Sequence, residues 1–349
     1  MSDTLGDAAP AASRRVLRSS FSRFTEWVAV LLLLVTVAGL LADYWWFLDL
    51  TNHVRPHLLV LLVGLCLAPS VFRRRLWLVM VLGGAAVNAA MVVPILLGRD
   101  TRSVDAHVPP LTVLAFNVYT PNPQHEHAIA YVAAIGVDLV LLQETSDHWL
   151  SDIRTGLKDY EVLAARPRVD NFGITLLARR DPPGGPPALR GTSVRFVDPS
   201  GGSARVTAIE LIGYWHDRPL AFLGLHTLPP VQGRVAANRD AQLRGAAQWA
   251  RRHEDVAVII AGDLNATPWS IPFRRLISES GLRNSMNGHW PTGTWHASLP
   301  GALQIPIDHC LYSDVLVLLS RQVGADSFGS DHRPVKARFG WLKATTTRE

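Results

Sequence analysis

The feature that most constrains the fold is a stretch from residue 27 to residue 98 that is dominated by Leu, Val, Ala and Gly. Its few charges fall in two short segments, which divide it into three apolar runs. Apolar side chains and an internally hydrogen-bonded backbone are what a lipid bilayer requires of a spanning helix. We therefore expect residues 27–98 to form a transmembrane region of about three helices, preceded by a cytoplasmic N-terminal segment at 1–26.

The three runs differ in length. The run 76–98 can span a bilayer core of about 30 Å unaided, at 1.5 Å per residue. The run 27–42 reaches that length if the aromatic residues at 44–47 lie in the membrane interface. The run 57–72 is short, and we expect it to cross because three arginines at 73–75 give it a sharp polar end. A signal peptide at 27–42 is the alternative, but no small-residue cleavage site follows that run.

Arginine placement predicts the orientation of these runs. Four arginines precede the first run and three separate the second from the third, so both segments are expected in the cytoplasm. Three crossings then place the chain after about residue 100 on the extracytoplasmic side, in a multi-pass protein of the cell membrane. Loss of the short second crossing would instead leave the downstream domain inside.

The remainder of the chain is nearly neutral. After residue 103 it holds 24 Lys and Arg against 23 Asp and Glu, so the formal net charge of +5 comes mainly from the membrane region. The broad basic face of a protein that clamps duplex phosphates is therefore not indicated. Cys310 is the only cysteine in this part, which excludes a disulfide within it, and we expect that thiol to be buried on a strand.

Strand-like segments dominate the chain after a linker at 99–110. They outnumber the helical segments, which fall between groups of strands, so we expect an α+β sandwich of two packed sheets with helices outside, over residues 111–341. A Pro- and Gly-rich loop at 179–191 is expected to carry no chemistry, and 342–349 form a C-terminal tail. The predicted strands lie within 111–119, 137–145, 172–179, 204–211, 219–227, 256–263, 305–313 and 333–340, and the predicted helices within 125–136, 237–253 and 270–279.

Six segments, most of them strand-like, end or break on residues that can bind metal ions or move protons. One such residue alone is ordinary turn chemistry, but six together form a chemically coherent set. In the segment VIIAGDLNATPWS, positions 263 and 265 are two apart and so face the same side of a strand. The six are Asn117, Glu144, His226, Asp263 with Asn265, Asp308 with His309, and Asp331 with His332.

The oxygen donors in this set favour a hard divalent cation. Glu144, Asp331 and Asn117 suit Mg²⁺, with Mn²⁺ as a substitute. Zinc is less favoured because the strand-end histidines lack ligand spacing such as HxxxH and no cysteine pair exists. His309 follows Asp308 directly, so on a strand it faces the other way and is expected to be structural.

The ordered motifs FN, QE, GLHT, GDLN, IDH and SDHRPV, between residues 111 and 340, resemble the endonuclease/exonuclease/phosphatase superfamily of DNase I-like phosphohydrolases. The resemblance implies a four-layer α/β/β/α sandwich whose site, at one rim, cleaves phosphoester bonds with a divalent cation, usually Mg²⁺. Matched by motif, the implied metal ligands are Glu144, Asn117 and Asp331, and the residues implied to hold the phosphate are His226 and Asn265. The acid/base candidates are Asp263 and His332, and Asp308 is implied to orient His332. The resemblance leaves open which of Asp263 and His332 takes the proton from the attacking water.

The resemblance predicts a reaction but not a substrate, since members cut DNA, RNA, inositol phosphates, sphingomyelin and other phospholipids. The near-neutral domain and the membrane anchor favour a phospholipid or another membrane-associated phosphoester. A membrane-tethered nuclease is the alternative, and a catalytically inactive protein that keeps the fold is a third. Trp269, Trp290 and Trp295 lie in expected rim loops, where they could contact lipid or a base or simply pack. No protein partner is predicted.

Overall fold

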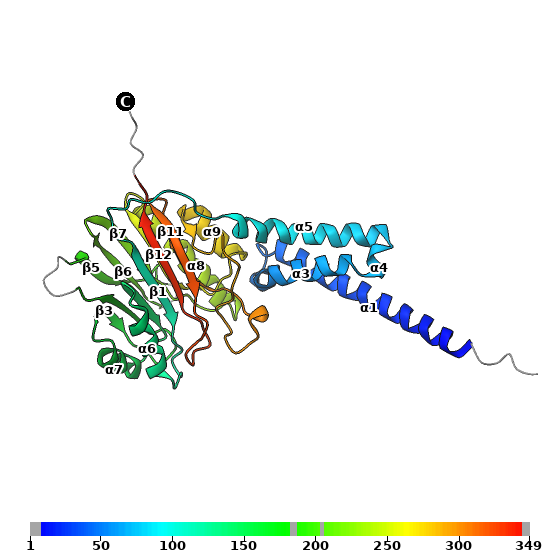
Figure 1. Ribbon diagram of the computed structural model, residues 1–349, viewed down its shortest axis with the longest axis horizontal. Helices are drawn as coiled ribbons and strands as arrows, with labels where there is room; N and C mark the ends of the chain where they lie inside the picture. Colours follow the sequence, from blue (N-terminus) through cyan, green and yellow to red (C-terminus); the bar gives the residue numbers. More distant parts are fainter. Residues whose placement is uncertain (1–7, 182–186, 203–205, 344–349) are drawn as a thin grey trace, which may run out of the picture. The chain divides into compact units, whose positions relative to one another are not determined.

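The structure is a computed structural model that describes residues 8–181, 187–202 and 206–343. The chain divides into two compact units, Met1–Pro94 and Ile95–Glu349 (Figure 1). Parts of the predicted terminal segments, of the loop 179–191 and of the strand 204–211 therefore lie outside the described residues.

The first unit is helical. Within the described residues, two helical stretches are long and apolar enough to cross a membrane by length and composition, Ser22–Leu40 and Arg75–Leu97. The predicted crossing at 57–72 is divided by a turn. The helix that contains its first part begins at Arg55 and ends at Cys66, and its 12 residues cover only about 18 Å of the roughly 30 Å bilayer core. The elements in chain order are α1 (Ala8–Leu40), α2 (Trp46–Asp49), the 3₁₀ helix η1 (Leu50–Val54), α3 (Arg55–Cys66), α4 (Pro69–Phe72) and α5 (Arg75–Leu97).

Polar contacts show how the chain returns along α1. Glu26, near the start of the apolar part of α1, pairs with Arg74 at 2.9 Å, just before α5. Near the other end of α1, the Asn52 side chain donates to the Gly39 carbonyl at 3.2 Å. The segment from 52 to 74 therefore runs back along α1, so that α1 and α5 point the same way through this unit.

A buried polar network holds these helices together. The Arg55 side chain is fully buried and donates to the side-chain oxygens of Asn52 at 2.8 Å and Asn88 at 3.0 Å. The Asn88 amide in turn donates to the Thr36 hydroxyl at 3.0 Å. Mutual hydrogen bonding is what makes such polar groups tolerable between apolar helices.

The second unit contains, within the described residues, two six-stranded sheets. The first has the order β11-β12-β1-β2-β4-β3 and the second β5-β6-β7-β8-β10-β9. The strands of the first sheet are β1 (Leu111–Asn117), β2 (Leu139–Gln143), β3 (Tyr160–Arg166), β4 (Ile174–Arg179), β11 (Leu316–Val323) and β12 (Val335–Trp341). Those of the second are β5 (Leu189–Val197), β6 (Ala208–Trp215), β7 (Arg218–Gly224), β8 (Ala257–Asp263), β9 (Arg283–Asn284) and β10 (Asp308–Tyr312).

The two sheets pack face to face, with helices on both outer faces. Leu141 of the first sheet and Phe222 of the second lie in one buried cluster between the sheets. Separate clusters join the first sheet to α6 (His125–Ile135) and α7 (Asp147–Gly156), and the second to α8 (Gly233–Arg252) and α9 (Ile271–Ser280) (Figure 1). The central strands are apolar on both faces because both faces are covered. The predicted four-layer α/β/β/α sandwich is confirmed.

The predicted linker at 99–110 packs on this unit and is not a free connection. The Asp100 carboxylate accepts hydrogen bonds from the Tyr312 hydroxyl at 3.0 Å and the Leu318 amide at 3.2 Å, and it pairs with Arg102 at 2.8 Å. Burial acts to raise the pKa of Asp100, but these donors outweigh it and hold that pKa well below its usual value. The sandwich therefore begins about ten residues earlier than the first strand.

Candidate active site

All eight predicted site residues lie at one edge of the sandwich. Asn117 ends β1 and Glu144 follows β2, which runs parallel to β1. Asp263 ends β8 and is paired in register with Asp308, the first residue of β10. His226 follows β7, parallel to β8, while Asp331 and His332 precede β12, antiparallel to β1. Strand direction therefore gathers these side chains from both sheets.

Glu144 is held by amide donors at the end of β2. Its backbone is left-handed, with φ 61°, and its side chain is buried. One carboxylate oxygen accepts from the Asn117 side chain at 2.8 Å and the other from the Thr120 amide at 3.3 Å. Burial raises the pKa of Glu144, although the charge of His226 and these donors oppose the rise. A cation beside this carboxylate would stabilise its ionised form.

Asp263 lies between two imidazoles. One of its oxygens is 3.5 Å from Nε2 of His226 and 3.7 Å from Nε2 of His332, and the Asn117 amide reaches the same oxygen at 3.4 Å. Burial acts to raise the pKa of Asp263, but the charge of His332 and the contact with His226 outweigh it and lower that pKa. Burial likewise acts to lower the pKa of His226, and Asp263 reverses that effect.

His332 forms a buried pair with Asp308. Its Nδ1 lies 2.9 Å from an Asp308 oxygen, and its backbone amide donates to the Ser330 hydroxyl at 3.0 Å. Burial acts to lower the pKa of His332, but the carboxylates of Asp308 and Asp263 raise it to about 10. Burial raises the pKa of Asp308. The pair therefore keeps a proton on the imidazole at neutral pH, in the orientation that Asp308 sets.

This pair predicts a loss of stability at alkaline pH. The folded pKa of His332, about 10, exceeds the unpaired value of 6.5, so its stabilising contribution is complete below about pH 6.5 and is lost as pH rises through 10. In chelator-treated protein, we expect the melting temperature to fall between pH 7 and pH 10.5 by less in Asp308→Asn than in the wild type. The exposed Asp255→Asn variant is the control, and an equal fall in all three would contradict the assignment.

Asn265 and Asp331 complete the edge. The backbone of Asn265 is left-handed, with φ 45°. Its backbone amide donates to the Asp263 carboxylate at 2.9 Å and its side-chain amide donates to the Thr227 carbonyl at 2.9 Å, so Asn265 helps to fix the position of that carboxylate. Asp331 accepts from the Trp295 indole at 3.1 Å through one oxygen. Its other oxygen is buried and accepts no hydrogen bond from any described residue, which leaves it available to a cation.

Sequence reasoning missed several supports of this site. The Ser330 hydroxyl donates to the Asn117 carbonyl at 2.7 Å and so ties the loop before β12 to β1. Trp295, noted only as a rim residue, orients Asp331, and the Thr294 hydroxyl accepts the Asp308 amide at 3.2 Å. Ser330 belongs to the SDH motif and could have been found there, whereas Thr120 carries no sequence signal.

Four residues flagged in the sequence lie outside the reactive group. His309 points away, its Nε2 2.9 Å from the Ala266 carbonyl, and burial lowers its pKa to about 3, as expected of a structural residue. Cys310 is fully buried on β10, and burial raises its pKa to about 12. Trp269 is buried in the interior, whereas Trp290 is 71% exposed.

The donor set fits a divalent cation. Glu144, Asn117 and the buried Asp331 oxygen offer oxygen donors at this edge. Beside them, ligand-type atoms of Asp263, Asp308 and His332 lie within 4.8 Å of one another. Four buried or half-buried carboxylates against two imidazoles leave an excess of negative charge. An oxygen-rich, negatively charged site of this kind suits a hard cation.

Comparison with known proteins supports this interpretation. A family model described as the Endonuclease/Exonuclease/phosphatase family matches residues 114–332. A search of curated proteins found no match.

Several solved structures have the same fold, and the similarity to this chain extends over nearly their whole length. D. rerio TDP2 complexed with a single-strand DNA product has a TM-score of 0.52 at 14% identity, covering 68% of this chain and 100% of that one. A mannosyl-6-phosphatase of Bacteroides thetaiotaomicron has 0.50 at 17%, covering 66% and 100%. The human Nocturnin catalytic domain has 0.50 at 18%, covering 69% and 98%. At these identities the similarity shows the fold.

Proposed function

The chain belongs to the endonuclease/exonuclease/phosphatase family, whose members hydrolyse phosphoester bonds with divalent metals, and on that premise we propose a membrane-anchored, Mg²⁺-dependent phosphodiesterase that acts on a phospholipid or another membrane-associated phosphoester. The observation that carries the proposed chemistry is the position of Asp263 between two imidazoles, one of them backed by Asp308. This arrangement places a carboxylate base next to two imidazole donors, as attack on an anionic phosphate requires.

Each residue of the site has a separate task in hydrolysis. The oxygen of the attacking water bonds to phosphorus while Asp263 accepts a proton from that water. The bond from phosphorus to the leaving oxygen breaks, its electron pair stays on the leaving oxygen, and that oxygen takes up a proton from solvent. His332, held protonated by Asp308, neutralises the charge that develops on the phosphate oxygens. His226, whose Nε2 lies 3.5 Å from the same Asp263 oxygen, also donates to the phosphate.

Glu144, Asn117 and Asp331 are the proposed metal ligands. When bound, Mg²⁺ neutralises the phosphate charge and polarises the bond to phosphorus. Mn²⁺, with similar ligand preferences, is expected to substitute. The buried Asp331 oxygen that lacks a hydrogen-bond donor among the described residues supports this assignment, as does the carboxylate of Glu144 in a buried setting.

Three exposed apolar side chains support a lipid substrate. Val169, Val231 and Trp290 are 84%, 66% and 71% exposed, and they lie in loops connected to site residues. The loop of Val169 is held to Thr145, next to Glu144, through the Arg168 amide at 3.0 Å. Exposed apolar side chains in these loops are available to an apolar interface, and the nearly neutral domain offers little attraction to duplex phosphates.

A tethered nuclease is the second candidate. The observation that favours it is the shared fold with D. rerio TDP2, whose structure holds a single-strand DNA product. Trp290, which is exposed, could stack on a base, and single strands need less basic surface than duplexes do.

The test uses the full-length chain in detergent with Mg²⁺. We would measure headgroup or phosphate release from vesicles of bacterial phospholipids and nucleotide release from single-stranded DNA, with Asp263→Asn as the inactive control. Vesicle hydrolysis at the higher rate supports the lipid proposal, and DNA hydrolysis at the higher rate replaces it with the nuclease. Hydrolysis of neither, nor of an aryl phosphodiester, by folded protein would overturn the enzyme proposal.

We also propose that the hydrolase domain lies on the extracytoplasmic side of the cell membrane. The contacts Glu26–Arg74 and Asn52–Gly39 support this side, because they make α1 and α5 run in the same direction. Two parallel helices that both cross the bilayer place the end of α5 opposite the arginine-rich N-terminus, even though α3 is short. A reporter fused after Glu349 tests this, and activity of a cytoplasm-specific reporter would contradict it.

A further inference from the structure

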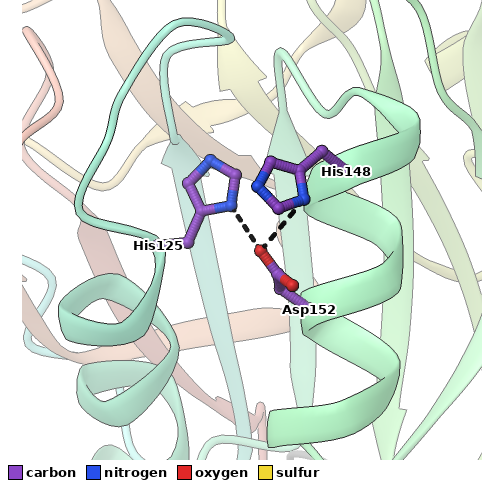
Figure 2. A group of neighbouring side chains, drawn as sticks. All are labelled: His125, His148 and Asp152. Atoms are coloured by element: carbon purple, nitrogen blue, oxygen red, sulfur yellow. Dashed lines mark hydrogen bonds and ion pairs between the residues drawn. The ribbon is translucent and has the colours of Figure 1, made fainter.

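A second cluster of ligand-type side chains lies apart from the hydrolytic residues, on the helices that cover the first sheet. Nδ1 of His125 is 2.7 Å from an Asp152 oxygen, and Nδ1 of His148 is 3.5 Å from the same oxygen (Figure 2). All three ligand atoms lie within 4.8 Å of one another. Two imidazole nitrogens and one carboxylate oxygen therefore converge on one point.

The local sequence explains this convergence. His148 and Asp152 are four residues apart on α7, so they share one face of that helix. His125 is the first residue of α6, and its ring stacks on Trp149 with centroids 3.6 Å apart. That stacking fixes the buried ring, whereas the side chain of His148 is 77% exposed and leaves the cluster open to solvent.

We propose that His125, His148 and Asp152 bind one Zn²⁺ ion, with water as the fourth ligand. Borderline transition metals bind a set of two imidazoles and a carboxylate more readily than Mg²⁺ does, and Zn²⁺ binds such a set in tetrahedral geometry. Tetrahedral bonds of about 2.0–2.1 Å place the donors about 3.3 Å apart. The 3.5 Å between His148 and Asp152 is close to that spacing, whereas the 2.7 Å hydrogen bond between His125 and Asp152 has to lengthen when the ion enters. Each imidazole presents an unprotonated Nδ1 to the ion, so any proton held there is released to solvent.

The cluster is connected to the hydrolytic edge through the protein. The Trp149 indole, against which His125 stacks, donates to the Tyr119 carbonyl at 3.4 Å. The next residue, Thr120, donates its amide to Glu144. An ion that clamps α6 to α7 therefore stabilises the segment that holds Glu144, and its binding does not depend on the proposed hydrolysis.

The experiment titrates Zn²⁺ into full-length protein in detergent, in a large excess of Mg²⁺, and measures the stoichiometry and affinity of binding by calorimetry. We expect one Zn²⁺ per chain in the wild type and affinity at least about 100-fold lower in His148→Ala, since even outer-shell changes cost metal sites 10–100-fold. The matched control is His127→Ala, an exposed histidine two residues from His125 on α6, which should bind as the wild type does. His148 is exposed, so its removal leaves the core intact.

Thermal melts supply a readout independent of activity. Zn²⁺ should raise the melting temperature of the wild type and His127→Ala but not of His148→Ala or Asp152→Asn, because an ion that binds only the folded chain stabilises it. Zn²⁺ affinity unchanged in His148→Ala would overturn the proposal. So would a Zn²⁺ equivalent lost in Asp263→Asn but kept in His148→Ala, which would place the ion at the hydrolytic edge.

Discussion

Replacing Asp263 by asparagine is expected to lower kcat on an aryl phosphodiester by about 10²–10⁴-fold, the usual contribution of a positioned acid or base. The change keeps the size of the side chain but removes the charge that faces His226 and His332. It thus removes the proton acceptor and the anion that raises the pKa of both imidazoles. The measurement is initial rate at saturating Mg²⁺ and neutral pH.

The control for this substitution is Asp326→Asn, an exposed carboxylate in the loop before β12. It should retain wild-type kcat, and thermal melts should show that both variants are folded. A folded Asp263→Asn enzyme within a few-fold of wild-type kcat would remove Asp263 from the reaction. His332 would then be left as the acid/base residue.

Replacing Glu144 by glutamine is expected to raise the Mg²⁺ concentration needed for half-maximal activity by at least about 10–100-fold, the cost of disturbing even an outer-shell metal contact. The amide keeps one oxygen but loses the charge that a hard cation prefers. The measurement is rate against Mg²⁺ concentration, with Glu161→Gln, an exposed residue of β3, as control. An unchanged Mg²⁺ dependence would show that Glu144 is not a ligand.

The two substitutions separate the proposed roles. Asp263→Asn should lower kcat while leaving the Mg²⁺ dependence close to that of the wild type, because its carboxylate faces the imidazoles. Glu144→Gln should shift the Mg²⁺ dependence, and part of its activity should return at high Mg²⁺. If both variants behaved alike, the division into metal ligands and acid/base residues would be wrong.

The interior strands were predictable from the sequence, but the four edge strands were not. The missed strands β3, β5, β9 and β11 are the two ends of each sheet. An interior strand, covered on both faces, is a continuous apolar run such as VAVIIAG. Edge strands such as β5 have several exposed positions, and β11 contains an irregularity between Leu318 and Ser320, so neither gives a regular pattern.

The site was predictable to the extent that its residues end predictable strands. Asp263 and Glu144 follow apolar runs directly, so their position at a sheet edge follows from the strands. Thr120 and Trp295 act through an amide and an indole in loops, where sequence gives no geometry. The cluster of His125, His148 and Asp152 joins two helices, and the spacing HxxxD alone is too common to indicate a site.

The reactive edge exists only where the two sheets meet. Asn117 and His332 flank strands of the first sheet, whereas Asp263 and Asp308 belong to the second, and the contacts Asn117–Asp263 and His332–Asp308 cross between them. Neither sheet alone holds a base, its partner imidazole and a metal ligand. A nascent chain whose sandwich has not yet closed therefore lacks the complete site and the proposed activity. Catalytic rate, in turn, reports the fraction of chains whose two halves have docked.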